Sequence, residues 1–122
     1  MSKTIFVVDD NDTNLAMAKD ALKDQYRVMT LPSAVKMFTL IEKVRPDLIL
    51  LDIEMPEMDG FEALQRLKSA DGFADIPVVF LTSMKDAGVE ARGFEMGAID
   101  FIDKPFSAPV LVQRIQTLLG VD

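Results

Sequence analysis

The chain is organised around the run LILLD at residues 48–52, four apolar residues that end in an acid. Such a run suits a strand that is covered on both faces, as in a parallel sheet. Two similar runs, IFVV at residues 5–8 and VVFL at residues 78–81, stand before and after it. The runs at residues 26–29 and 99–102 include polar side chains, so we expect them to form the edge strands.

Helical patterns fill the intervals between these runs. Apolar residues recur there at spacings of three and four, which places them on one face of a helix. The five sets are Leu15, Ala18 and Leu22; Val35, Phe38 and Ile41; Phe61, Leu64 and Leu67; Val89 and Phe94; and Leu111, Ile115, Leu118 and Leu119. Strands that alternate with helices predict an α/β fold. We expect residues 1–122 to form one domain, a flavodoxin-like doubly wound sheet of five parallel strands in the order 2-1-3-4-5 with five helices.

Short polar residues mark where helices are expected to begin. The expected N-caps are Asp12 or Thr13, Ser33 and Ser107. The segment 86–96 is the weakest of the helical patterns, because Gly88 and Gly93 each lower helix propensity by about 1 kcal/mol. It is either a movable helix or a segment in which the two glycines mark turns.

Composition excludes several classes of protein. The 122 residues include 20 acidic and 13 basic side chains, for a net charge of −7, which argues against direct binding of nucleic acid. The absence of cysteine excludes disulfides and thiol chemistry, and the absence of histidine removes the commonest general base. No apolar run approaches the ~20 residues that a membrane helix needs, so we expect a cytoplasmic protein without a membrane anchor.

Reactive side chains follow four of the predicted strands. In sheets of this kind, ligands bind beyond the carboxyl ends of the strands. The side chains found there are Asp9 and Asp10, then Asp52, then Thr82, and finally Lys104. Each of them alone is commonly a helix cap, a turn residue or a solvated charge. Their occurrence in order at four strand ends of one chain indicates a single site.

The chemistry of this site follows from its charges. Asp9, Asp10 and Asp52 would repel one another unless a cation neutralised them, and Mg²⁺ is bound by carboxylates of this kind. A carboxylate can also attack a phosphoryl group to give an aspartyl phosphate. Asp52 is the best candidate for this nucleophile, because it stands alone at the end of the most apolar strand, with the other two acids on one side and Thr82 on the other.

At these positions the sequence resembles the receiver domains of two-component response regulators, the CheY-like family. The resemblance covers essentially the whole chain. It rests on residues 7–10 (VVDD), 50–60 (LLDIEMPEMDG), 81–83 (LTS), 97–98 (GA) and 101–106 (FIDKPF).

The resemblance implies the metal site and the phosphoacceptor. Asp52 would accept the phosphoryl group in an Mg²⁺-dependent reaction. Asp10 would bind Mg²⁺ more directly than Asp9, which would act through water. The backbone carbonyl of Glu54 would be a further ligand. The side chain of Glu54 would influence hydrolysis of the aspartyl phosphate, and so would Met84.

The resemblance also implies a switch. Thr82 would form a hydrogen bond with the phosphoryl group, and Lys104 would pair with a phosphoryl oxygen or with Asp52. The Lys104–Pro105 peptide bond would be cis. Phe101 takes the position of the switch aromatic, where tyrosine is common. It would fill the volume that Thr82 vacates, and so alter the face around the fourth helix, the fifth strand and the fifth helix.

Three other types of site share some of these residues. An aspartate-nucleophile phosphohydrolase of the haloacid dehalogenase type needs a D-x-D-x-[TV] motif, but Glu54 and Pro56 follow Asp52 at those spacings. A calcium loop beginning at Asp10 has Leu15 where glycine is needed. A flavin carrier would place its phosphate against Asp9 and Asp10. The phosphohydrolase is kept as the alternative.

The expected partner is a sensor histidine kinase or a phosphotransfer protein, which would donate the phosphoryl group. The domain would act as a switch and not as a turnover enzyme. It is read as a free-standing regulator or as the amino-terminal receiver of a longer response regulator, with the output domain or target protein left open. A homodimer through the fourth and fifth helices is a further possibility.

Overall fold

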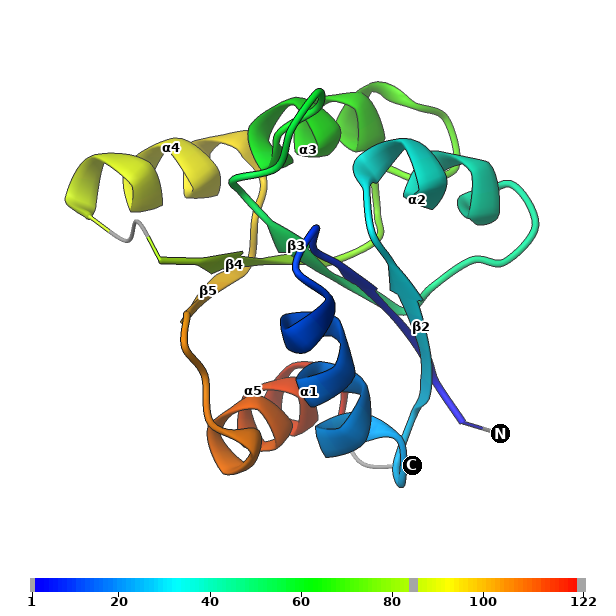
Figure 1. Cartoon of the computed structure of the whole chain (residues 1–122). Helices are drawn as coiled ribbons and strands as arrows, with labels where there is room; N and C mark the ends of the chain where they lie inside the picture. Colours follow the sequence, from blue (N-terminus) through cyan, green and yellow to red (C-terminus); the bar gives the residue numbers. More distant parts are fainter. Residues whose placement is uncertain (1, 84–85, 121–122) are drawn as a thin grey trace.

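The apolar runs of the sequence extend side by side as the strands of one parallel sheet. The computed structural model describes residues 2–83 and 86–120. Within these residues the sheet has five strands in the order β2-β1-β3-β4-β5, which confirms the predicted flavodoxin-like topology (Figure 1). The strands are β1 (Thr4–Val8), β2 (Arg27–Leu31), β3 (Leu48–Asp52), β4 (Val78–Thr82) and β5 (Asp100–Asp103).

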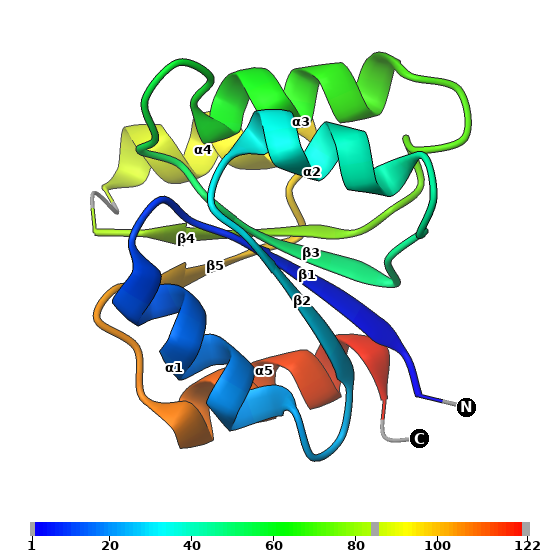
Figure 2. The ribbon, with the colours of Figure 1, turned by 45° about the vertical axis from the view of Figure 1, so that its right-hand side comes forward.

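Helices connect the strands and cover both faces of the sheet. They are α1 (Asp12–Leu22), α2 (Ala34–Ile41), α3 (Gly60–Ser69), α4 (Ala87–Met96) and α5 (Ala108–Leu119). Helices α2, α3 and α4 lie on one face, and α1 and α5 lie on the other (Figures 1 and 2). Every residue of β1, β3 and β4 is therefore buried, as their apolar sequences predict, whereas β2 and β5 form the edges. No helix in the described part of the chain has the length and apolar character needed to cross a bilayer.

The sheet register aligns the strand ends that carry the reactive side chains. Val8 pairs with Leu51 across β1 and β3, and Asp52 pairs with Leu81 across β3 and β4. All strands run in the same direction, so their carboxyl ends meet at one edge of the sheet. The residues that directly follow these pairs therefore come together, although they lie far apart in the sequence.

Two edge strands begin one residue later than predicted. Tyr26 precedes β2, where it is buried and its hydroxyl group donates a hydrogen bond to the carbonyl of Gly120 at 3.2 Å. Ile99 precedes β5 and is 43% exposed. The expectation for the α2 stripe is also corrected: Ala34, Met37 and Ile41 are buried, while Val35 is 50% exposed and Phe38 is partly buried. Apolar residues fill most of α2, so the sequence offered two possible faces and packing on the sheet selected one.

The expected caps are confirmed for α2 and α5 and corrected for α1. Ser33 and Ser107 accept hydrogen bonds from backbone N–H groups in the first turns of their helices. The N-cap of α1 is Asn11, whose Oδ1 accepts from the backbone N–H of Asn14 at 3.0 Å. Three consecutive capping residue types begin this helix, and propensity alone does not choose among them.

Helix α4 is regular through both of its internal glycines, so Gly88 and Gly93 do not mark turns. Gly93 is buried against the ring of Phe101: a Cβ added there would lie 2.4 Å from Cζ of Phe101 and 3.2 Å from Cδ2 of Phe80. A larger residue at this position would therefore force the helix or the rings apart. Phe94, expected to anchor the helix, is instead 47% exposed, because Gly93 occupies the face toward the sheet.

Four phenylalanines, two from helices and two from strands, contact one another in sequence on the face of the sheet that α2, α3 and α4 cover. We call these four residues the aromatic row. The ring centroids are 5.4 Å apart between Phe61 and Phe80, 5.5 Å between Phe80 and Phe101, and 5.1 Å between Phe101 and Phe94. Tilted and edge-to-face contacts at these distances are favourable for aromatic pairs. The row thus joins α3, β4, β5 and α4 in one packed unit.

Candidate functional site

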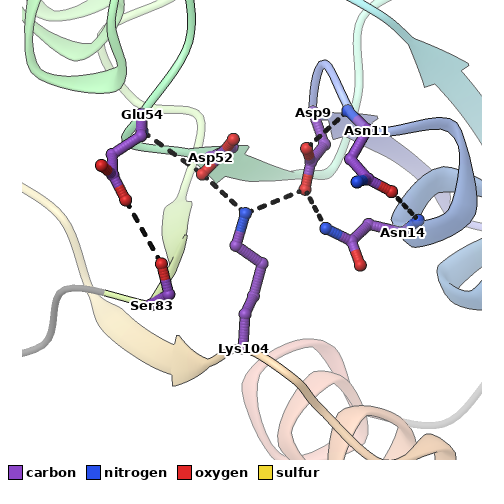
Figure 3. Close-up of polar contacts among 7 residues, drawn as sticks. All are labelled: Asp9, Asn11, Asn14, Asp52, Glu54, Ser83 and Lys104. Carbon is purple, nitrogen blue, oxygen red and sulfur yellow. Dashed lines mark hydrogen bonds and ion pairs between the residues drawn. The ribbon is translucent and has the colours of Figure 1, made fainter.

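The site lies at the carboxyl edge of the sheet, where three strands deliver charged side chains to one point. Asp9 directly follows β1, Asp52 ends β3, and Lys104 directly follows β5. The ammonium Nζ of Lys104 lies 2.9 Å from Oδ1 of Asp52 and 3.3 Å from Oδ2 of Asp9, so one cation bridges the two carboxylates (Figure 3). The sequence therefore predicted the convergence of these three residues correctly.

The carboxylate of Asp9 has no exposed surface, and donors satisfy both of its oxygens. Its Oδ1 accepts the backbone N–H of Asn11 at 2.9 Å. Its Oδ2 accepts the side-chain N–H of Asn14 at 3.1 Å in addition to the ammonium of Lys104. A buried charge is tolerated only when it is paired and hydrogen-bonded, and Asp9 meets both conditions.

Asp52 is 2% exposed and has an unusually high pKa for an aspartate. Burial disfavours its charged form and raises the pKa to about 6, and the nearby charge of Asp9 acts in the same direction. The hydrogen bonds from Lys104 and from the backbone N–H of Glu54, at 3.3 Å, oppose this rise. The carboxylate of Asp52 is thus more basic than that of an exposed aspartate.

The charge of Lys104 is stabilised by the two acids. Burial acts to lower the pKa of its ammonium group, but the hydrogen bond and the charge of Asp52, together with Asp9, outweigh burial and raise the pKa. Lys104 therefore remains a cation at neutral pH. The following Lys104–Pro105 peptide bond is cis, as expected.

Asp10 completes an acidic pocket with Asp9 and Asp52. One carboxylate oxygen from each residue can be chosen so that all three lie within 4.8 Å of one another. Asp9 and Asp52 are buried, whereas Asp10 is exposed to solvent at the mouth of the pocket. Hard oxygen ligands with an open side suit Mg²⁺, which binds few protein carboxylates and keeps several waters. The donor set therefore fits the expected metal.

A hydrogen bond joins the residues that follow β3 and β4 beside this pocket. The side chain of Glu54 accepts a hydrogen bond from the hydroxyl group of Ser83 at 3.2 Å, which ties the β3–α3 loop to the residue after β4 (Figure 3). Thr82 is buried at the end of β4, and its carbonyl accepts the backbone N–H of Lys104 at 2.9 Å. Met84 lies outside the described residues.

Gly60 allows α3 to begin directly against the end of β3. A Cβ at this position would lie 2.5 Å from the carbonyl oxygen of Asp52 and 2.7 Å from Cα of Ile53. The backbone N–H of Gly60 instead donates to the carbonyl of Ile53 at 2.8 Å. The absence of a side chain at Gly60 thus permits the close turn that follows Asp52.

The expected switch residue, Phe101, lies behind the site and not in it. Its ring is 2% exposed and packs between Phe80 and Phe94 within the aromatic row. Phe80, which contacts this ring, and Thr82 lie two residues apart on β4, so their side chains point to the same face of the sheet.

Sequence reasoning missed two residues of the site, Asn11 and Asn14. Both hold Asp9 through hydrogen bonds, and both come from the start of α1. The available signal was their spacing of three residues, the distance between an N-cap and the third residue of a helix. The sequence Asp10–Asn14 also has oxygen-bearing side chains at calcium-loop spacing, but α1 begins at Asp12, so this segment is the start of a helix and not a calcium-binding loop.

Comparison with known proteins agrees with this geometry. Residues 5–116 match the model of the response regulator receiver domain family. The chain is 33% identical over 121 residues to the polar-differentiation response regulator DivK of Brucella anthropi, and the match covers 98% of each protein. It is 39% identical over 116 residues to a probable cyclic di-GMP phosphodiesterase of Vibrio cholerae, covering 95% of this chain but only 26% of that longer protein.

A solved structure shows the same arrangement of strands and helices. The chemotaxis protein CheY4 of Vibrio cholerae superimposes with a TM-score of 0.92 at 27% identity, covering 98% of this chain and 100% of that one. Sequence and fold thus point to one family.

Proposed function

This chain belongs to the response regulator receiver domain family, and on that premise we propose that Asp52 accepts a phosphoryl group from a sensor histidine kinase or a phosphotransfer protein. The family makes the protein a phosphoacceptor switch and not a turnover enzyme. The observation that carries the proposal for Asp52 is its position: a buried carboxylate, 2.9 Å from the ammonium of Lys104, with Asp9 and Asp10 beside it.

The transfer is written as a displacement at phosphorus. An oxygen of the Asp52 carboxylate attacks the phosphoryl group, the bond from phosphorus to the donor imidazole breaks, and an acyl phosphate forms. The imidazole nitrogen keeps the electron pair of that bond. The raised pKa of Asp52 favours this attack, because a more basic carboxylate is a better nucleophile.

Other residues position the charges that this step requires. Asp9, Asp10, Asp52 and the backbone carbonyl of Glu54 would hold Mg²⁺, which when bound neutralises the carboxylates and the incoming phosphoryl oxygens. Lys104 would exchange its contact with Asp52 for a phosphoryl oxygen. Thr82 would donate its hydroxyl hydrogen to another.

The output would pass through the aromatic row. Phosphorylation adds about −1.5 to −2 of charge and strong acceptor oxygens at Asp52. A shift of Thr82 toward these oxygens would move β4, which carries Phe80. The packing of Phe101 against Phe80, and of Phe94 against Phe101, would change as a result. We therefore propose that the face formed by α4, β5 and α5 reports the phosphorylated state. We retain the cytoplasm as the expected compartment.

Intact mass spectrometry tests the proposal. The protein is incubated with Mg²⁺ and acetyl phosphate, with an excess of EDTA in a parallel sample. We expect a gain of one phosphoryl group that requires Mg²⁺ and disappears in Asp52→Asn. The control is Asp75→Asn, which removes an exposed acid in the turn before β4 and should leave the gain intact. Equal gain in Asp52→Asn and in the wild type would refute the assignment.

A further inference from the structure

Helix α1 begins with an altered capping box that binds Asp9. In the usual form, the third residue of the helix is Glu or Gln, and its side chain accepts the backbone N–H of the N-cap. Here the third residue is Asn14, and the N-cap N–H, that of Asn11, donates instead to Oδ1 of Asp9 at 2.9 Å. The carboxamide of Asn14 is thereby left to donate to Oδ2 of Asp9 at 3.1 Å (Figure 3).

We propose that Asn14 is a positioning residue for the acidic pocket: its carboxamide fixes the Asp9 carboxylate from the first turn of α1 and so strengthens the binding of Mg²⁺. The inference rests on the proposed function, in which the pocket holds Mg²⁺. Asn14 itself is not a metal ligand. It acts through Asp9, a residue with no exposed surface whose orientation depends on its donors.

The second donor to Oδ2 of Asp9 is the one that the reaction would remove. Lys104 is closer to Asp52, at 2.9 Å, than to Asp9, at 3.3 Å. When Lys104 moves to a phosphoryl oxygen, Asn14 remains as the side-chain donor to Oδ2 among the described residues. Asp9 can then keep its orientation throughout the transfer.

A neutral donor also suits this position electrostatically. A carboxamide orients the Asp9 oxygen without adding a charge that would compete with the metal. Loss of Asn14 would leave the ammonium of Lys104 as the side-chain donor to Oδ2 of Asp9 among the described residues, and a cation beside this carboxylate opposes the binding of Mg²⁺. Loss of the carboxamide would therefore both loosen the orientation of Asp9 and leave a competing cation beside it, and both changes should weaken Mg²⁺ binding. Groups that orient metal ligands typically contribute about 10- to 100-fold in affinity or activity.

The test measures Mg²⁺ affinity directly, by isothermal titration calorimetry of the metal alone. Asn14→Leu removes the donor with little change in size, and Asn14→Ala is a second variant with less bulk. Thr13→Ala is the matched control, because Thr13 is an exposed neighbour in the same helical turn. We expect a dissociation constant for Mg²⁺ about tenfold higher in both Asn14 variants and unchanged in Thr13→Ala.

Two further measurements separate positioning from a purely structural role. Urea unfolding in EDTA should show that the Asn14 variants keep a cooperative transition and stay folded under the titration conditions, although the loss of a donor to the buried Asp9 carboxylate lowers their stability. Phosphorylation by acetyl phosphate should recover the wild-type rate at saturating Mg²⁺. An unchanged dissociation constant, with or without loss of stability, would overturn the inference.

The outcomes also distinguish this inference from the proposed function. If the wild type gains the phosphoryl group while the Asn14 variants bind Mg²⁺ as tightly as the wild type, the inference alone fails. If the wild type binds Mg²⁺ more tightly than the Asn14 variants but never gains a phosphoryl group, the phosphoacceptor assignment fails and the role of Asn14 stands. A wild type that does not bind Mg²⁺ would overturn the inference.

Discussion

The acidic pocket and the aromatic row are neighbours, because Asp52 pairs with Leu81 of β4, the residue after Phe80, but different physical effects stabilise the two regions. The pocket buries two carboxylates and one ammonium, whose energies depend on every neighbouring charge. The row consists of neutral rings, and their contribution to stability depends only on close contact between them. Removal of a ring should therefore always destabilise the fold, whereas removal of a charge should stabilise or destabilise it according to sign. The predictions below test this difference.

The largest expected effect is in the aromatic row. Phe80 has no exposed surface and contacts both Phe61 and Phe101, so Phe80→Ala should lower the free energy of unfolding by about 3–5 kcal/mol. Urea unfolding in EDTA measures the change. Phe94→Ala is the matched control at the exposed end of the row and should lose about 1 kcal/mol. Equal losses at the two positions would contradict a buried, continuous row.

The next largest effect on stability is expected from loss of the cation of the pocket, Lys104. Lys104→Met leaves the carboxylates of Asp9 and Asp52 close together without their shared positive charge, so we expect a loss of about 3 kcal/mol at pH 7 in EDTA. Saturating Mg²⁺ should restore part of it. Lys36→Met, at an exposed position on α2, serves as the control. A loss no larger than that of the control would mean that the contacts of Lys104 with Asp9 and Asp52 contribute nothing to stability.

Removal of the Asp52 carboxylate should instead raise the free energy of unfolding. The pKa of Asp52 is raised from 3.8 to about 6 in the folded protein, so the native state binds more protons than the unfolded chain between these values. Stability from this group therefore falls as pH rises through that window, and the full penalty is present above pH 6. Asp52→Asn should stabilise the protein by about 2 kcal/mol at pH 7 in EDTA.

The pH dependence distinguishes this effect from a change in packing. The gain of Asp52→Asn over the wild type should shrink as the pH falls from 6 to 4, because the wild-type carboxyl group becomes neutral there. Urea titrations at several pH values measure it. A gain that does not vary with pH would show that the charge of Asp52 is not its cause.

The smallest effect compares two glycines of the same helix. Gly93→Ala places a Cβ against the ring of Phe101, and the cost of this overpacking should exceed the gain in helix propensity, for a net loss of about 1 kcal/mol. At Gly88 a Cβ would meet, among the described residues, only the side chain of Asp86, at 3.4 Å, so Gly88→Ala should stabilise by about 0.5–1 kcal/mol. Thermal unfolding compares the two. A stabilising Gly93→Ala would refute close packing of α4 on the row.

Much of the fold was predictable because its signals are local. The continuously apolar runs identified β1, β3 and β4, and the alternation of strands and helices gave the parallel sheet. The face of α2 and the cap of α1 were not predictable in the same way. In each case several residues of the right type stand together. Packing on the sheet selects the face of α2, and Asn11, the N-cap of α1, is the residue whose backbone N–H donates to the buried carboxylate of Asp9.

The sequence by itself determined which side chains would stand at the carboxyl edge of the sheet. Asp9 directly follows an apolar run, Asp52 ends one, and Lys104 comes two residues after the run at 99–102. Parallel strands bring such positions together whatever the details of packing. Only the tertiary structure decided how these charges are held. The bridging position of Lys104 between Asp9 and Asp52 depends on distances between β1, β3 and β5, and no local pattern encodes such distances, whereas the donors to Asp9 come from the adjoining start of α1.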